Sequence, residues 1–277
     1  MKIGNTVTLL TMAVLLASVP AFAGSVTAPD LDGGSSFGLI GGTVSNTGTS
    51  VVIGNVWAMT SLKGFPPGIA TGSVAVAGPI VTSAFDDFVT AYNYAFSDSD
   101  TPPTQTVTGG LSTSQTFVGN NVYSFSSTDV TSTAGVILNF DAEGNSSDVF
   151  IMKDIDNLTI DGPITFDLTG GALASNIYWI IGSTATISPG GAPVVFDGNI
   201  LAGTSFTMSA NTGGSGVLAG TINGCVFAES GTATLAGTTD INGCASSSLT
   251  PEPGTAGLII IGCLLAAFQM RKTSVAG

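Results

Sequence analysis

The chain has 277 residues and a formal net charge of −13, with 5 Lys or Arg residues, 18 Asp or Glu residues and no His. Such an acidic, base-poor surface repels nucleic acid and anionic lipid, which excludes nucleic acid as a partner. The lack of His removes the commonest general base and the commonest metal ligand, so His-dependent triads and His-ligated zinc sites are excluded.

The start of the chain, residues 1–23, has the pattern of a secretory signal peptide. Lys2 precedes an apolar stretch from Val7 to Val19, and small residues follow at Ala21 and Ala23. This order of a basic residue, an apolar run and a small-residue cleavage site is typical of export signals. We therefore expect a signal peptide over residues 1–23 and a secreted mature domain over residues 24–245.

Short β-like runs bounded by small residues follow between Gly33 and Met59. Gly64–Gly68 contains two prolines and must be a turn, because proline continues neither a helix nor a strand ladder. We expect the early runs to be coils of a stacked β structure. The segment from Lys63 to Val76 is our candidate cap for one of its open ends.

An amphipathic helix is predicted over residues 79–97. Its apolar residues recur at a spacing of three to four, and Pro79 suits a first helical turn. The stripe consists of Val81, Phe85, Phe88, Tyr92, Ala95 and Phe96. We expect it to pack along the β structure. A membrane-surface helix would need basic residues on its polar face, and this face carries Asp86 and Asp87 instead.

Beyond a connecting loop expected at Asp98–Thr108, strand signals continue without a linker to Asp240, which favours one domain. Between Asn176 and Asp240, runs of about five residues alternate apolar with small polar side chains. The runs are 176–181, 182–187, 198–202, 204–208, 222–227 and 231–235. Similar runs at regular spacing predict stacked coils, because one coil cannot bury its apolar face alone.

Two cysteines lie in matching sequence contexts, as Thr221-Ile-Asn-Gly-Cys225 and Asp240-Ile-Asn-Gly-Cys244. The spacing between these two motifs suits one turn of a three-sided β-solenoid. Adjacent coils lie about 4.8 Å apart, within the roughly 4.4–6.8 Å Cα separation of disulfides. In an exported chain we expect a disulfide between Cys225 and Cys244, the alternative being two free thiols.

The repeated runs predict a surface of hydroxyl groups. If the apolar residues of these runs point inward, alternation sends the intervening Ser and Thr residues outward in two files. The candidate residues are Thr159, Thr184, Thr186, Ser205, Thr207, Thr232 and Thr234. Thr133, Thr165, Thr238 and Thr239 mark other possible rows. A plain solvent-facing surface is the alternative, because Thr is common in any exposed strand.

Two groups of acidic residues raise the question of a calcium site or catalytic carboxylates. They are Asp141, Glu143 and Asp148, and Asp154, Asp156 and Asp161. Neither group has the full spacing of a known calcium loop, and solvated turns account for them better. We therefore predict no catalytic residue, no metal ligand and no cofactor.

Residues 246–277 resemble a sorting signal. Pro251, Glu252 and Pro253 precede a short apolar run from Ala256 to Phe268, which Arg271 and Lys272 follow. The tripeptide, apolar helix and basic pair resemble, in that order, the PEP-CTERM signal of Gram-negative bacteria. The resemblance implies processing by a membrane exosortase and delivery to the cell surface or extracellular matrix. Contact with the membrane is then expected only through this segment.

Seven segments in one order resemble the ice-binding-like family over nearly the whole mature domain. They lie at Phe37–Gly48, Gly64–Gly68, Ala91–Ala95, Asn121–Ser127, Leu138–Asn145 with Asp148–Ile151, Asn176–Thr186 and Gly198–Ala202. The resemblance implies an irregular, right-handed, three-faced β-solenoid with one long α-helix beside it. The chain departs from the family pattern in a longer Gly-rich turn at Asn211–Gly216 and in its paired cysteines.

The resemblance implies an extracellular, non-enzymatic protein that binds ice or ordered water. Two alternatives remain. A structural or adhesive matrix protein would bind extracellular polysaccharide or itself and have no ice activity. A polysaccharide lyase would use Lys or Arg as its base, and the domain offers only Lys63 and Lys153.

Overall fold

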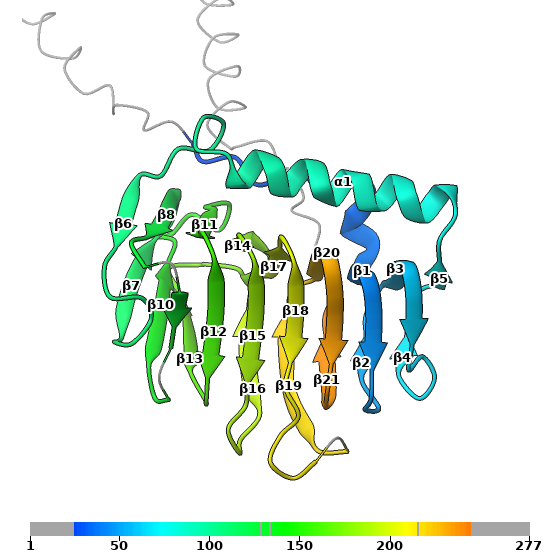
Figure 1. The fold of residues 1–277 in the computed structure, drawn as a ribbon. Helices are drawn as coiled ribbons and strands as arrows, with labels where there is room; N and C mark the ends of the chain where they lie inside the picture. The colour runs from blue at the N-terminus through cyan, green and yellow to red at the C-terminus, as the bar shows by residue number, and fades with distance from the viewer. Residues whose placement is uncertain (1–24, 128, 133, 215, 245–277) are drawn as a thin grey trace, which may run out of the picture. The chain divides into compact units, whose positions relative to one another are not determined.

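The computed structural model describes residues 25–127, 129–132, 134–214 and 216–244 (Figure 1). The expected signal peptide and the sorting segment therefore lie outside the described residues. The described chain is mainly β, with parallel strands stacked in three ladders and one α-helix. No helix among these residues is long and apolar enough to cross a membrane.

The first ladder lies beside the α-helix and is called the helix ladder below. Every neighbouring pair in it is parallel. Its order is β6 (Gln105–Val107), β8 (Asn121–Phe125), β11 (Phe150–Asp154), β14 (Ile177–Ile181), β17 (Asn199–Ala202), the first halves of β20 (Val226–Leu235), β1 (Phe37–Asn46) and β3 (Asn55–Lys63), then β5 (Val74–Val76).

The second ladder carries the predicted hydroxyl files and is called the hydroxyl ladder. It joins the first because β20, β1 and β3 are long enough to contribute to both. Its order is β9 (Asp129–Thr131), β12 (Asn157–Asp161), β15 (Thr184–Ser188), β18 (Ser205–Met208), and the second halves of β20, β1 and β3.

The third ladder consists of two separate parallel sheets. One contains β7 (Gln115–Val118), β10 (Ile137–Asp141) and β13 (Thr165–Thr169). The other contains β16 (Val194–Asp197), β19 (Leu218–Asn223), β21 (Thr238–Ile241), β2 (Val51–Val52) and β4 (Ile69–Ala70). Short 3-10 turns lie at Asp32–Ser36 and Ala174–Asn176.

The coils are not stacked in chain order. β1 pairs with β20 in parallel, joining Leu39 to Val226, so the first coil stacks on the last one. In Figure 1 the blue β1 lies beside the orange β20, and α1 with the loop after it runs back from β5 towards β6. The helix thus returns the chain to the far end of the stack, from which the remaining coils are laid down.

The α-helix, α1 (Pro79–Phe96), confirms the helix predicted at residues 79–97. Its expected stripe is buried at Val81, Phe85, Phe88, Tyr92 and Ala95. The stripe meets outward apolar side chains of the helix ladder. Phe88 stacks on Phe227 of β20 with ring centroids 5.1 Å apart, and the Tyr92 hydroxyl donates to the Ile181 carbonyl of β14 at 3.2 Å. Packing rather than capping fixes this helix, because its N-cap, Gly78, makes no side-chain cap bond.

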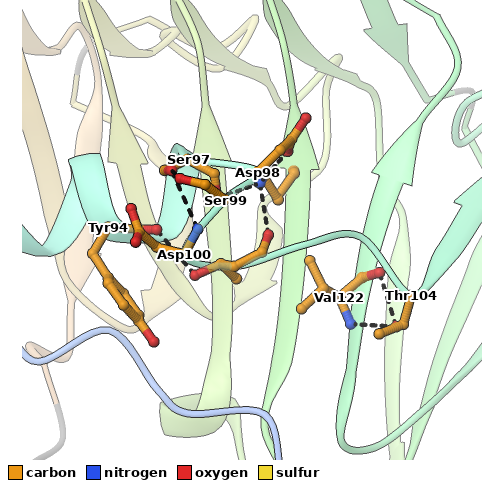
Figure 2. A network of polar contacts seen from close by, with 9 residues as sticks. Tyr94, Ser97, Asp98, Ser99, Asp100, Thr104 and Val122 are labelled. Atoms are coloured by element: carbon orange, nitrogen blue, oxygen red, sulfur yellow. Dashed lines mark hydrogen bonds and ion pairs between the residues drawn. The ribbon is translucent and has the colours of Figure 1, made fainter.

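A buried lysine holds the far end of α1. The Lys153 Nζ of β11 donates to Asp98 Oδ1 at 2.6 Å, to the Thr101 carbonyl at 3.0 Å and to the Ser97 carbonyl at 3.3 Å. A cation there also interacts favourably with the C-terminal end of the helix dipole. Figure 2 shows the rest of this network, in which the Ser97 and Ser99 hydroxyls lie 2.8 Å apart.

The interior of the stack is filled by the inward apolar residues of the coils. Aromatic rings run along it; for example, Phe166 contacts Phe196 and Phe140 at centroid distances of 5.0 and 6.0 Å. Such a continuous core supports the expectation that one coil buries its apolar face against the next.

Two predicted boundaries were wrong. The run 222–227 is two strands, because β19 ends at Asn223 and β20 begins at Val226 around a corner at Gly224. A Cβ at Gly224 would lie 2.1 Å from the Gly198 carbonyl oxygen of the coil below, so the corner needs glycine. The loop expected at Asp98–Thr108 contains the short edge strand β6.

The matched cysteines lie on adjacent coils, as their spacing predicted. Thr221 pairs with Asp240 and Ile222 with Ile241 in register. Cys225 and Cys244 form a disulfide with Cα atoms 4.5 Å apart, and both are buried. The alternative of two free thiols is therefore wrong for this structure.

Candidate functional site

The structure places all seven candidate hydroxyl residues on the hydroxyl ladder. Each is partly exposed, while the apolar residues between them are buried in the core. The buried partners are Leu158, Ile160, Ala185, Ile187, Phe206, Met208, Ala233 and Leu235. The strict period of two in the sequence, polar then apolar, sets this orientation.

The outward residues form two rows that run across the coils. The first row contains two pairs in strand register, Thr184 with Ser205 and Thr232 with Thr43. The Thr232 N–H donates to Ser205 Oγ at 3.3 Å and so links the two pairs. The second row runs in register through Thr131, Thr159, Thr186, Thr207, Thr234 and Ser45. Neighbouring hydroxyls are thus about 4.8 Å apart between coils and about 6.7 Å apart along a strand.

Thr43 and Ser45 are members of these rows that the sequence did not identify. Their local pattern, Thr43-Val-Ser45, predicted a strand but gave no sign of its neighbours. Thr43 pairs with Thr232 and Ser45 with Thr234, partners that lie near the opposite end of the described chain. A third, shorter row was also missed, in which the Ser188 hydroxyl donates to Ser209 Oγ at 3.4 Å.

Charged side chains bound the rows and do not interrupt them. Asp129 and Asp161 lie on β9 and β12 at one end, and Lys63 pairs with Ser45 at the other. Across β15, β18, β20 and β1 the two rows contain only Ser and Thr. Charged side chains hold their hydration water tightly. The uncharged part of the two rows is therefore best suited to contact a neutral, ordered surface.

Among the described residues, the other two ladders do not offer a comparable surface. The helix ladder is covered by α1. The third ladder carries Asp141, Asp167 and Asp240 on its outward positions, beside exposed apolar residues such as Val195.

The other threonines that the sequence suggested as possible rows do not form a continuous row on the described strands of the third ladder. Thr165 and Thr238 point outward in two different sheets of the third ladder, while Thr239 is fully buried. Thr133 lies outside the described residues. No continuous file of hydroxyls therefore joins these positions in the described part of the third ladder.

The acidic groups serve turns and corners. The Asp141 carboxylate accepts from the Glu143 N–H at 2.9 Å, and Asp148 accepts from the Asn145 amide at 2.6 Å. No group of three or more acidic, Cys or His side chains is placed to hold a metal ion in the part of the chain that the structure describes.

Asp154 differs from the other carboxyl groups because it is fully buried. It lies where the chain leaves β11 for β12, and its Oδ1 accepts from the Asp156 N–H at 3.1 Å, while Oδ2 has no hydrogen-bond partner. Burial, with smaller contributions from Asp156 and Asp129, raises the pKa of Asp154 to about 7. The carboxyl group is therefore half neutral near pH 7.

Neither lysine of the domain is placed as a catalytic base. Lys153 is 3% exposed and bound to Asp98 and two carbonyls at the end of α1. Lys63 lies at the edge of the hydroxyl rows, beside Ser45. Of the two lysines, Lys153 is thus used to hold the end of α1.

Comparison with known proteins gives one consistent family. The model of the ice-binding-like family matches residues 39–241. An ice-binding protein of Nostoc sp. (strain HG1) is 31% identical over 285 residues, which covers 98% of each chain.

Two solved structures share the fold. The crystal structure of an ice binding protein from an Antarctic biological consortium is 29% identical, with a TM-score of 0.66 over 80% of this chain and 94% of that chain. That of an ice-binding protein from the ascomycete Antarctomyces psychrotrophicus is 28% identical, with a TM-score of 0.67 over 78% of this chain and 98% of that chain.

Proposed function

We propose that this chain, which belongs to the ice-binding-like family, binds ice through the two uncharged rows of the hydroxyl ladder. The observation that carries the proposal is the register of Thr184, Thr186 and their neighbours across four adjacent strands. No comparable row of hydroxyls is found on the other two ladders of the described chain.

The chemistry of threonine suits a solid water surface. Its hydroxyl group can join an ordered water layer, while its methyl group favours water cages over bulk water. Branching at Cβ restricts χ1, so little side-chain entropy is lost when the array docks. Spacings of about 4.8 and 6.7 Å within one array are comparable to repeats on ice surfaces.

We infer that the three ladders are the three faces of a right-handed β-solenoid, with α1 covering one face. The parallel pairing of every ladder supports this geometry, as does the passage of each coil from the helix ladder to the hydroxyl ladder and then to the third ladder. The hydroxyl ladder is then one flat face, and no catalytic role is proposed for any residue.

We also propose secretion and delivery to the cell surface or matrix of a Gram-negative bacterium. The support is the sequence pattern of residues 1–23 and the tripeptide Pro251, Glu252 and Pro253 with its apolar run and the basic pair. An exosortase would be the processing partner. A matrix protein that binds polysaccharide and not ice remains the competing function, since the same signals would deliver it.

Ice shaping and inhibition of recrystallisation test the proposal on the purified chain with its disulfide formed. We expect faceted crystals and suppressed coarsening at micromolar protein. Thr207→Tyr should remove both effects, because the larger ring lifts the face from a flat lattice. Thr165→Tyr, a matched change on an exposed strand of the third ladder, should leave both intact. Round, freely coarsening crystals with folded wild-type protein would favour the matrix function.

A further inference from the structure

We infer that this domain is built to hold ice while it carries a mechanical load through its C-terminal segment, with the Cys225–Cys244 disulfide preventing that load from pulling β21 and the Thr232–Thr234 part of β20 out of the stack. The inference rests on the proposed function and on the three-faced solenoid proposed above. It concerns the point where the chain leaves the stack, which neither of those proposals uses.

The described chain ends at the corner between the third ladder and the helix ladder. After β21, the Asn242 N–H donates to the Ile222 carbonyl at 2.9 Å, and the Cys244 N–H donates to the Phe37 carbonyl at 2.9 Å. Phe37 is the first residue of β1, which begins on the helix ladder. Cys244 therefore lies at the last position of the third ladder, just before the chain would enter the helix ladder.

Among the described strands, no position is open beyond that corner. The next place on the helix ladder would lie between β20 and β1, and these two strands already pair directly, Val226 with Leu39 and Phe227 with Ile40. The helix ladder therefore has no vacant place next to Cys244 among the described strands. In a three-sided stack, the corner between the helix ladder and the third ladder lies opposite the hydroxyl face.

The N-terminal segment is held at the same corner. The Val26 N–H donates to the side chain of Asn120, the residue just before β8 enters the helix ladder. Ser25, Val26 and Thr27 also line a cavity of about 240 Å³ with Tyr94 near the end of α1. Both ends of the described chain therefore attach behind the hydroxyl face, which leaves that face clear when either end is fixed to a support.

The disulfide determines which strands a pull on the C-terminal end would load. Without it, tension at Cys244 would act first on the short strand β21 and then, through a short turn, on β20, which carries Thr232 and Thr234. With it, tension passes covalently from Cys244 to Cys225. The two cysteines have a sequence separation of 19, and the loop between them contains both threonines.

The anchor of the load path lies in the buried packing between the stack and α1. Cys225 is fully buried and precedes Phe227, which contacts both Phe85 and Phe88 of α1. The Cys225 N–H also donates to Asn199 Oδ1 of the coil below at 3.2 Å. The load thus enters a corner that is tied to the helix and to the neighbouring coil, and bypasses the second half of β20, which presents Thr232 and Thr234.

Bead adhesion under flow tests the inference directly. The full chain, biotinylated after Gly277 and bound to streptavidin beads, is placed on an ice surface, and the shear that removes half of the beads is measured. We expect firm attachment of wild type and a several-fold lower shear for the Cys225→Ser/Cys244→Ser variant. The same variant should shape ice in free solution as wild type does. Biotin at Ser25 is the matched control, because that load does not pass β21, and there the two proteins should detach alike.

The outcomes separate the inference from the proposed function. If the free chain shapes ice but C-terminally bound beads do not attach, or if the two proteins detach at equal shear from the C-terminal end, the inference is wrong and ice binding stands. If the free wild-type chain does not shape ice, the proposed function fails.

A second measurement, on wild-type protein, tests the inference if the double variant does not fold. Single wild-type molecules are stretched through their two ends, under a force below global unfolding, and a reductant is added. The freed loop between the cysteines should lengthen the molecule by roughly 60 Å, since an extended chain spans about 3.3–3.6 Å per residue. No added length on reduction would overturn the inference.

Discussion

The hydroxyl ladder and the helix ladder are made from the same coils, and their outward side chains have opposite uses. On β20, Phe227 points outward into α1, and a few residues later Thr232 and Thr234 point outward to solvent. One face thus contributes buried area and stability, whereas the other contributes an exposed, uncharged array. Activity and stability are thus carried by different halves of one strand and should be separable by mutation.

The largest expected effect comes from a charge in the hydroxyl rows. Thr234→Asp places a strongly hydrated carboxylate between Thr207 and Ser45. We expect at least a hundredfold loss of ice activity, measured by inhibition of recrystallisation, with a melting temperature within a few degrees of wild type. An unchanged activity would show that the rows are not the contact surface.

The helix ladder should show the reverse behaviour. Phe227→Ala removes a fully buried ring that contacts Phe85 and Phe88. Large-to-small changes of this kind cost about 3–5 kcal/mol of unfolding free energy. Urea denaturation should show this loss, while ice shaping near 0 °C persists for as long as the variant remains folded. Loss of ice shaping by a fully folded variant would show that the two faces are coupled.

Asp154 lies between the two ladders and makes their common stability depend on pH. Its pKa is raised to about 7 in the folded protein, so the folded state binds a proton that the unfolded state releases above about pH 4. Stability from this group is therefore fully present at low pH and is lost as the pH rises from about 4 through 7, by about 3 kcal/mol.

The control for this prediction is Asp154→Asn. The amide cannot ionise, so melting temperatures measured from pH 4 to pH 8 should lose the component that falls with rising pH. An identical pH profile in both proteins would contradict the assigned role of burial. Ice activity at fixed pH should not change, because Asp154 is not on the hydroxyl rows.

The end of α1 offers a smaller test of the covered face. Lys153→Met removes three hydrogen bonds to Asp98, Ser97 and Thr101 and should cost about 2 kcal/mol. Asp98 is the matched control, since its side chain is 76% exposed. Asp98→Asn should therefore cost less than about 1 kcal/mol in the same denaturation experiment.

The smallest effect is expected at the edge of the rows. Ser45→Ala removes one hydroxyl next to Lys63, where the uncharged part of the surface ends. We expect a loss of activity of only a few fold, against a larger loss for Thr207→Ala at the centre. Equal losses at both positions would mean that the contact surface extends past Lys63.

The sequence predicted those features of the two ladders that depend only on local residue patterns. A period of two placed Thr186 outward and Ala185 inward, and a period of three to four placed Phe88 of α1 against the stack. Both patterns report directly on which face of an element is buried. The matched cysteines likewise predicted adjacent coils, because both lie at the same corner.

The sequence did not predict features that depend on distant pairing. Nothing near Thr43 indicates that its strand stacks on β20, since the partner, Thr232, lies near the opposite end of the described chain. Lys153 was a single residue with no motif, and its role depends on where α1 ends. The run 222–227 was read as one strand because a corner made by Gly224 keeps the apolar alternation of a strand.

Partition of the protein into slowly grown ice tests the central claim most directly. Fluorescently labelled wild type, Thr186→Tyr and Thr165→Tyr, each shown to be folded by its melting curve, are compared in the same ice. The account predicts that wild type and Thr165→Tyr enter the ice while Thr186→Tyr stays in the liquid. Entry of Thr186→Tyr at the wild-type level, or exclusion of all three folded proteins, would contradict ice binding by the hydroxyl ladder.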